Sequence, residues 1–186
     1  MPPEILNPPA IEPVALAYAK SFLRVDHTHD DALISDMIIS ARMRVESMSG
    51  HALIIRRLLA RFPANSKAQI HLPSQPVSTV QEIRAVNLGG ASSVIPANRY
   101  RLNTRCQPPR IALNMQTHWH EFTPNLETIE VEYFAGYGED MSDVPIPFKQ
   151  AILLLLAQSY EHRDGANLPV PMMVDALLVP YRWVRL

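Results

Sequence analysis

Apolar residues recur with a helical period at both ends of the chain and with a strand-like period between them. Residues 13–50 and 147–186 each show the three- and four-residue spacing of two helices. The long middle segment is typical of short strands and turns. Because the best packing segments lie at opposite ends of the sequence, we expect those ends to meet. The pattern predicts an α+β fold, in which a four-helix body formed by the N- and C-terminal segments carries a small inserted antiparallel β region.

The predicted boundaries follow from this pattern. Residues 1–50 and 145–186 form the helical body and residues 51–144 the β-rich insertion, within a single domain. The proline-rich residues 1–13 lack the basic start and apolar run of a signal peptide, so we expect an extended arm there.

Two helices are predicted near the N-terminus. The first begins at Pro13, whose fixed φ suits a first helical turn, and ends near Val25. Polar residues 26–31 then supply the cap of a second helix, which ends at Gly50. Its apolar side is expected to carry Leu33, Ile34, Met37, Ile38, Ala41, Val45 and Met48, and its polar side Asp36, Arg42, Arg44 and Glu46.

The third helix is predicted from Pro147 to about Gly165. Its centre, residues 152–156, is apolar in every direction and therefore needs cover on all sides. That cover could come from the helical bundle, from another subunit, or from both. A last helix follows Pro171 and should bend or end at Pro180.

Strands are predicted at six places in the middle segment. The clearest, residues 128–134, alternates so that Ile129, Val131 and Tyr133 face inward while Glu130 and Glu132 face outward. Residues 77–86 alternate imperfectly, which indicates a bulge, and Gly89-Gly90 is typical of a hairpin turn. The other strands are expected at residues 52–60, 68–72, 99–102 and 110–113, the last two at sheet edges.

Composition narrows the class of protein. Of the 186 residues, 47% are hydrophobic and 19% charged, which is typical of a folded protein. The net charge of −1 shows no excess of basic residues, which disfavours a protein that reads a DNA groove. The single cysteine, Cys106, excludes an intrachain disulfide and favours a reducing cytoplasm. The longest apolar run, residues 151–157, is too short to span a bilayer, so we expect no membrane partner.

Two clusters of histidines and acids are the candidate metal ligands. They are His27, His29, Asp30 and Asp31, and His118, His120 and Glu121. A helical zinc site needs histidines four residues apart and a third ligand, which neither cluster offers, so solvated turn residues are the better interpretation. Cys106 has no local signature of an activated nucleophile. We therefore expect no catalytic residue, no cofactor and no metal.

Charged residues of opposite sign are separated along the middle of the chain. Basic residues come first, at Arg56, Arg57, Arg61, Arg99, Arg101, Arg105 and Arg110. Acidic residues follow, at Glu127, Glu130, Glu132, Glu139, Asp140 and Asp143. Opposite patches on one subunit would suit head-to-tail self-association.

Three separated segments, in order, carry a resemblance to a known family. They are residues 12–26 with 30–34 and 44–50, residues 133–138 with 144–155, and residues 177–182. Together they resemble the head-to-tail connector (adaptor) proteins of tailed bacteriophages and gene transfer agents, over nearly the whole chain.

The resemblance implies a structural role without catalysis. Such a protein forms a ring of about twelve subunits beneath the portal protein, where it extends the DNA channel and bridges the head to the next connector or tail component. Double-stranded DNA would pass through without sequence-specific binding. The expected location is the head–tail interface of a virion or gene transfer particle assembled in a bacterial cytoplasm.

The C-terminal segment is the predicted portal-docking element, because aromatic and Arg side chains dominate protein interfaces. Its residues are Tyr181, Arg182, Trp183, Arg185 and Leu186. Alternatively, Trp183 closes the core of the helical bundle.

Two other functions stay open at this point. One is a small metal-dependent hydrolase that uses the histidine clusters, which bound metal or turnover would reveal. The other is a monomeric module that binds a peptide at a strand edge. Ring formation distinguishes the connector from both.

Overall fold

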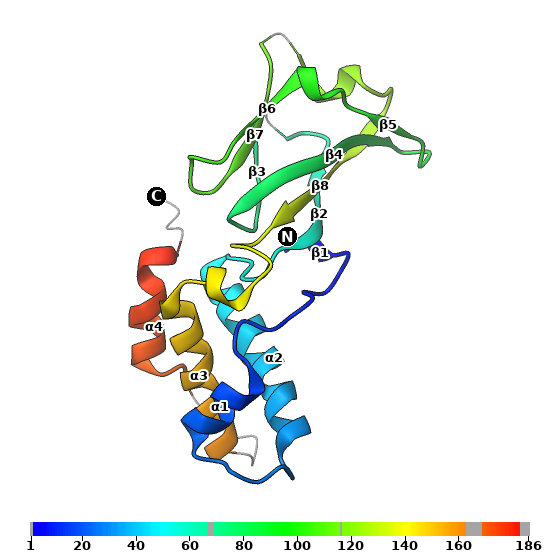
Figure 1. Ribbon diagram of the computed structural model, residues 1–186. Helices are drawn as coiled ribbons and strands as arrows, with labels where there is room; N and C mark the ends of the chain where they lie inside the picture. Colours follow the sequence, from blue (N-terminus) through cyan, green and yellow to red (C-terminus); the bar gives the residue numbers. More distant parts are fainter. Residues whose placement is uncertain (1, 67–68, 116, 163–168, 183–186) are drawn as a thin grey trace. The chain divides into compact units, whose positions relative to one another are not determined.

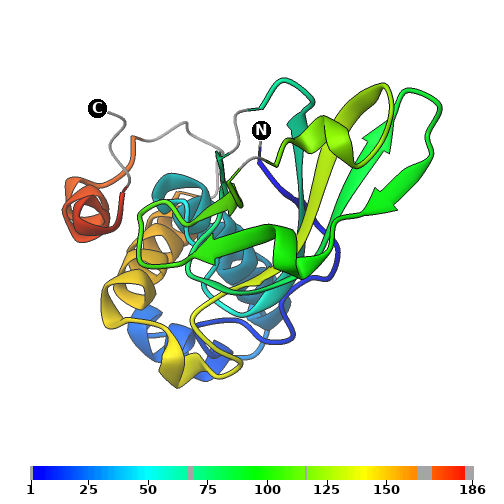
Figure 2. The same ribbon diagram turned by 90° about the horizontal axis from the view of Figure 1, so that it is seen from above.

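The computed structural model describes residues 2–66, 69–115, 117–162 and 169–182. These residues form four α-helices and eight strands, and the strands belong to two sheets (Figures 1 and 2). They divide into two compact units. The β unit comprises the residues up to Pro8 and Ile55–Gly136, and the helical unit comprises Pro9–Ile54 and the residues from Tyr137 onward.

The predicted α+β class is confirmed, but the description of a four-helix body with a small β insertion is wrong. Eight strands in two antiparallel sheets make the protein rich in sheet, and the described N-terminal arm supplies one of those strands. The prediction failed because short strands flanked by prolines have weak local patterns, so two of the eight were not recognised.

The helical unit contains α1 (Leu16–Leu23), α2 (Asp31–Ser49), α3 (Ile146–Glu161) and α4 (Met172–Leu178), with the 3-10 turns η3 (Met141–Asp143) and η4 (Val179–Tyr181). α3 packs against both α2 and α4, while α1 contacts α2 and α3. Figures 1 and 2 both show α3 between α2 and α4. Helices from the two ends of the sequence thus share one core.

The apolar centre of α3 is covered by its own chain. Ile152, Leu153, Leu155 and Leu156 are buried, and Leu154 is partly buried against the same core. Facing them are the buried residues of α2 and α4, namely Ile34, Ile38, Ala41, Val45, Val174 and Leu178. The described part of the helical unit therefore buries the apolar centre of α3, as the sequence analysis expected of this segment.

The ends of α2 and α4 agree with the local signals, whereas α1 begins at Leu16, after the predicted Pro13, and α3 ends at Glu161, before the predicted Gly165. Gly50 has a left-handed φ of 73°, and its N–H donates to the carbonyl oxygen of Glu46, which confirms the predicted stop of α2. α4 gives way to the 3-10 turn that contains Pro180, as predicted. Lys20 on α1 binds the carboxylate of Asp31 in the first turn of α2, with 2.5 Å between Nζ and Oδ1.

The larger sheet has the order β1-β2-β8-β4-β5, and all neighbours are antiparallel. Its strands are β1 (Glu4–Ile5), β2 (Arg56–Pro63), β8 (Leu126–Ala135), β4 (Val77–Asn87) and β5 (Ser92–Val94). Ile129, Val131 and Tyr133 on central β8 are fully buried, which confirms the predicted alternation. Glu132, predicted to face solvent, is also buried and is considered below.

The connection between β4 and β5 also follows the prediction. β4 has register shifts against β8, the irregularity expected of a bulged strand. At the turn Gly90 has a φ of 81°, and the side-chain oxygen of Asn87 accepts the N–H groups of Gly89 and Ala91. The hairpin at Gly89-Gly90 is therefore confirmed.

The smaller sheet has the order β3-β7-β6 and is antiparallel. Its strands are β3 (Gln69–His71), β7 (Arg110–Leu113) and β6 (Tyr100–Asn103), with the 3-10 turns η1 (Ala97–Arg99) and η2 (Trp119–Glu121) in the same unit. β6 lies at an edge as predicted. β7 is central, so its predicted edge position is wrong, because β3 pairs with its other side.

Candidate functional site

The described end of the C-terminal segment packs into the helical unit. The phenol ring of Tyr181 lies on Phe148 of α3, with ring centroids 4.5 Å apart. His51 and Tyr137 complete an aromatic cluster, in which the imidazole stacks on Tyr137 with an interplanar angle of 10°. This aromatic cluster, defined by His51, Tyr137, Phe148 and Tyr181, anchors the turn η4.

Hydrogen bonds fix the tautomer of neutral His51. Its Nε2 lies 3.2 Å from the backbone carbonyl oxygen of Tyr181, which can only accept, so Nε2 donates. Nδ1 then accepts from the hydroxyl of Tyr137 at 2.9 Å. Burial lowers the pKa of His51, an effect that the hydrogen bond to Tyr181 partly opposes. Burial also raises the pKa of Tyr137, and neighbouring Tyr181 adds to that rise.

Arg182 follows the cluster and is held on α4. Its Nη2 lies 2.6 Å from the Oδ1 atom of Asp175. Of the five predicted portal-docking residues, Tyr181 and Arg182 thus have defined partners in the helical unit. Trp183, Arg185 and Leu186 lie outside the described residues. Portal docking by this segment stays a prediction.

A buried ion network on α2 was not recognised from the sequence. Arg42 Nε lies 2.7 Å from Glu12 Oε2, and its Nη1 lies 2.9 Å from Glu46 Oε2. The other carboxylate oxygen of Glu46 accepts the N–H of Leu53 at 2.9 Å. Burial lowers the pKa of Arg42, but hydrogen bonds and charges from both glutamates outweigh it and raise the pKa overall. The predicted polar side of α2 is therefore wrong at Arg42 and Glu46, whose i, i+4 spacing was the available signal.

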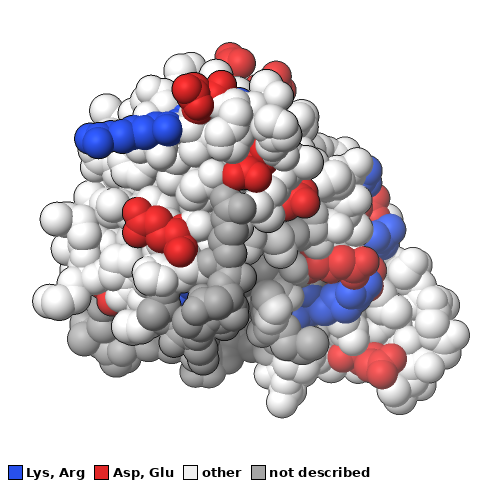
Figure 3. Space-filling view, turned by 90° about the horizontal axis from the view of Figure 1, so that it is seen from below, with Lys and Arg blue, Asp and Glu red and all other residues white. Residues whose placement is uncertain are grey.

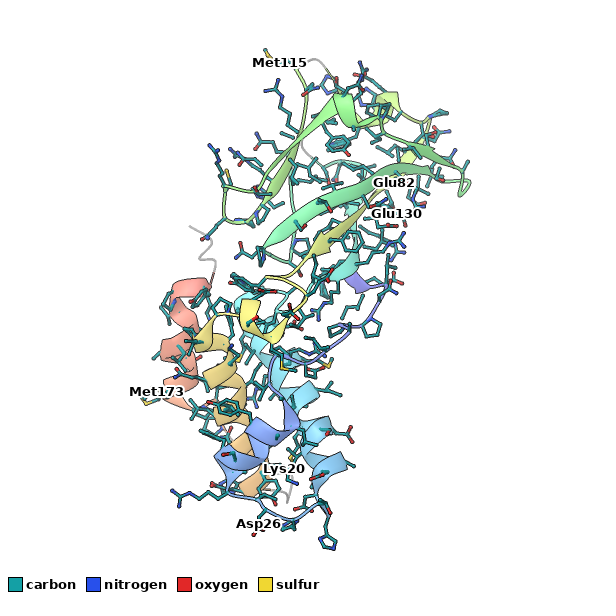
Figure 4. All side chains as sticks on the ribbon, in the orientation of Figure 1. Lys20, Asp26, Glu82, Met115, Glu130 and Met173 are labelled. Carbon is teal, nitrogen blue, oxygen red and sulfur yellow. The ribbon has the colours of Figure 1, made fainter. Side chains whose placement is uncertain are left out.

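Charges that are separated along the sequence are paired within the β unit. Because β2 and β8 are neighbours, Arg57 binds Glu132, and Arg61 binds Glu130 with 2.9 Å between Nε and Oε1. Arg84 lies 3.3 Å from Glu82 and 3.6 Å from Glu130, and Figure 4 shows these two acids on adjacent strands. On the face drawn in Figure 3, acidic and basic side chains are interspersed among uncharged ones.

The charge-based argument for head-to-tail association is therefore weakened. Glu130 and Glu132, which the sequence analysis assigned to an acidic patch, pair with Arg61 and Arg57 of the expected basic patch. Basic character persists at the smaller sheet. Among the described residues, no ion pair joins Arg101, Arg105 or Arg110 to a carboxylate.

The histidine clusters lie in turns. The rings of His27 and His29 are 5.6 Å apart, and those of His118 and His120 stack at 5.3 Å. Glu121 caps its own turn, accepting the N–H of His118 at 2.8 Å. In the part of the chain that the structure describes, no three His, Cys, Asp or Glu side chains converge as metal ligands. Cys106 is a partly buried free thiol.

None of the helices within the described ranges combines the length and apolar character needed to cross a membrane.

Comparison with known proteins gives matches among solved structures. The sequence matches no protein-family profile and no curated protein. The structure is similar to a chain in the virion of a native gene transfer agent particle, with a TM-score of 0.83 and 27% identity over 100% of this chain and 97% of that one.

Two further matches are chains in the necks of such particles. One comes from the neck of an empty particle computed with C6 symmetry, with a TM-score of 0.80. The other comes from the neck of a native particle computed with C12 symmetry, with a TM-score of 0.74. Each is 28% identical and covers 100% of this chain and 97% of that chain. The similar chains are thus components of gene transfer agent particles, which supports a location in such a particle.

Proposed function

We propose that this protein is a head-to-tail connector (adaptor) subunit in the neck of a gene transfer agent or phage-like particle. The observation that carries the proposal is the match over the full length of the chain to chains of a gene transfer agent virion and neck. Fold similarity alone would not indicate function. Here the identity of 27–28% extends across both units of the chain.

In this proposal the protein works as a ring rather than as an enzyme. The C6 and C12 symmetry of the matched necks supports a cyclic assembly, and closed rings require one surface of each copy to meet a different surface of the next. The ring would contain about twelve copies, lie beneath the portal protein and extend the channel for DNA. Its other side would receive the next connector or a tail component.

The two units would have different tasks within one connector domain. The helical unit would form the body of the ring, and the β unit would project from it or line an interface. The C-terminal segment would dock on the portal. The aromatic cluster supports this assignment, since it fixes the position of Tyr181 near the end of the described residues.

Removal of the last four residues tests the portal contact. A truncation after Arg182 keeps Tyr181 and its contact with Phe148 in the helical unit. We expect the truncated protein to keep the unfolding midpoint of the full chain and to lose binding to the portal protein of the same particle in a pull-down assay. A Trp183→Ala/Arg185→Ala variant should weaken binding in the same way, whereas Met115→Ala, at an exposed position of the β unit, should not.

Unchanged portal binding by the truncated protein would contradict the docking assignment. A chain that stays monomeric beside its portal protein would favour the peptide-binding alternative. Stoichiometric zinc with hydrolytic turnover would favour the hydrolase.

A further inference from the structure

One side of α4 is apolar and exposed. We call this surface the α4 patch, and it consists of Met172, Met173, Ala176, Val179 and Pro180. Met172 is 88% exposed, Met173 62% and Val179 60%. The opposite side of the helix buries Val174 and Leu178 in the core, and Figure 4 shows Met173 pointing away from α3. A surface of this kind, without a charge among its five members, is unusual for a helix that faces only water.

A second apolar surface lies on α2. This α2 patch consists of Ile39 and Met43, one helical turn apart, and Met43 is 54% exposed. α2 is buried through Ile38 and Val45, which lie on the side that packs against α3. Ile39 and Met43 therefore face away from the core.

The two patches lie on different helices of the helical unit. α3 stands between most of α2 and α4 in Figures 1 and 2, although these two helices also touch each other, and both patches occupy exposed positions on helix sides that do not face the core. A closed ring needs such an arrangement, because each copy must meet one neighbour on each side through different surfaces. In a twelvefold ring neighbouring copies are rotated by only about 30°, so the two contact surfaces of a copy face in nearly opposite directions.

We propose that the α4 patch of one copy packs against the α2 patch of the next copy in the ring. This inference rests on the proposed connector function and specifies the surfaces that build its ring. A second copy fits better than an unrelated partner, because one docked peptide would use one patch and leave the other exposed. Methionine side chains adapt to irregular surfaces, so Met172, Met173 and Met43 can form the apolar centre of this contact.

Disulfide trapping tests the pairing of the two patches. In a Cys106→Ser background, Met173→Cys and Met43→Cys are introduced together and separately into the full chain. The proteins are mixed with the portal protein of the same particle, oxidised and separated on non-reducing gels, while electron microscopy records whether rings are present. The double variant should give a ladder of covalent oligomers, the mixture of the two single variants should give only dimers, and each single variant alone should give none.

Each other outcome overturns the proposal in a recognisable way. Rings without a ladder mean that the copies meet through other surfaces, and the connector function then stands without this contact. Dimers of a single variant mean that like patches meet like patches. Absence of rings, with or without the portal protein, overturns this inference and the connector function together.

Charged substitutions provide a second readout. Met173→Glu and Met43→Glu should each lower the ring fraction at least tenfold, because a carboxylate would be buried in the contact. Both side chains are exposed in the single chain, so the unfolding midpoint should not change. Met115→Glu is the matched control, since Met115 is 95% exposed and belongs to the β unit. Rings as abundant in both Met→Glu variants as in the control would refute the contact.

Discussion

His51 Nε2 lies 3.2 Å from the carbonyl oxygen of Tyr181, so a residue just beyond the C-cap of α2 holds η4, the turn that follows α4. The two residues are 130 positions apart in the sequence. This hydrogen bond, together with the stacking of Tyr181 on Phe148, couples the exit point of the C-terminal segment to the core of the helical unit. A displacement of that segment by a bound partner would therefore act on the helical core.

Acid should destabilise the protein through His51. Burial lowers its pKa in the folded protein below 6.5, whereas the unfolded chain titrates near that value. Between the two pKa values the unfolded chain binds a proton that the folded protein does not, so the free energy of unfolding falls as the pH drops below about 6.5. Above that pH the contribution of His51 is fully present. Urea unfolding at pH 7.5, 6 and 5 measures the effect.

A His51→Gln variant should lose this part of the pH dependence, because glutamine does not titrate. The variant can be less stable at every pH, yet its profile between pH 7.5 and 5 should be flatter. His29→Gln is the control, since His29 is exposed. An equal slope for the wild type and His51→Gln would assign the acid sensitivity to other groups.

Arg42→Met should destabilise the helical unit by about 3–5 kcal/mol, because it leaves the buried carboxylate of Glu46 without its cation. Adding Glu46→Gln should recover part of the loss, since the amide oxygen can still accept the N–H of Leu53. Arg44→Met, at an exposed position of the same helix, should change stability by no more than about 0.5 kcal/mol. Denaturant unfolding of the three variants checks this. Similar losses in Arg42→Met and Arg44→Met would contradict a role for the network.

Gly138→Ala should destabilise the protein by about 1–3 kcal/mol through overpacking. A Cβ atom at this position would lie 2.0 Å from Oδ2 of Asp143. That carboxylate cannot move freely, since it accepts the N–H of Asp140 and thereby holds the turn η3. Gly89→Ala is the matched control, because its Cβ would be 3.4 Å from the nearest atom. The thermal midpoint of Gly138→Ala should be clearly lower than that of Gly89→Ala. Equal midpoints would show that the side chain of Asp143 can move aside with little loss of stability.

Arg57 and Glu132 should show a coupling of about 0.5–1 kcal/mol in a double-mutant cycle. Their side chains meet across β2 and β8, with 2.5 Å between Arg57 Nε and Glu132 Oε1. Because the side chain of Arg57 is 45% exposed, 1 M salt should reduce the coupling. A coupling near zero in dilute buffer would mean that Arg84, 3.9 Å from Glu132, compensates for the loss of Arg57.

Local patterns predicted elements correctly where the decisive contacts are close in sequence. The alternation of Ile129, Val131 and Tyr133 identified β8, and Gly50 marked the end of α2. Both signals depend only on backbone geometry and on which side of an element meets the core.

Prediction failed where the outcome depends on which distant segments become neighbours. Glu132 was assigned to solvent because it alternates with apolar residues, but Arg57 on an adjacent strand lets it be buried. Arg42 was placed on a polar helix face because of its position in the helical period, and Glu12 from the N-terminal arm allows its burial. The central position of β7 depends on β3, which comes about forty residues earlier, and no local pattern encodes such pairing.

The candidate site was only partly predictable. The aromatic and basic C-terminal segment stood out by composition, but the packing of Tyr181 against His51 and Phe148 required the fold. The α4 patch was not predicted, because the sequence indicated a last helix after Pro171 without showing which of its sides meets the core. In the structure Val174 and Leu178 are buried in the core, whereas Met172 and Met173 are exposed.

Electron microscopy of the purified chain bound to the portal protein of the same particle tests the central claim most directly. The account predicts a closed ring of copies of this chain, with cyclic symmetry, in contact with the portal ring. A portal ring without added density, beside a chain that remains monomeric, would contradict it.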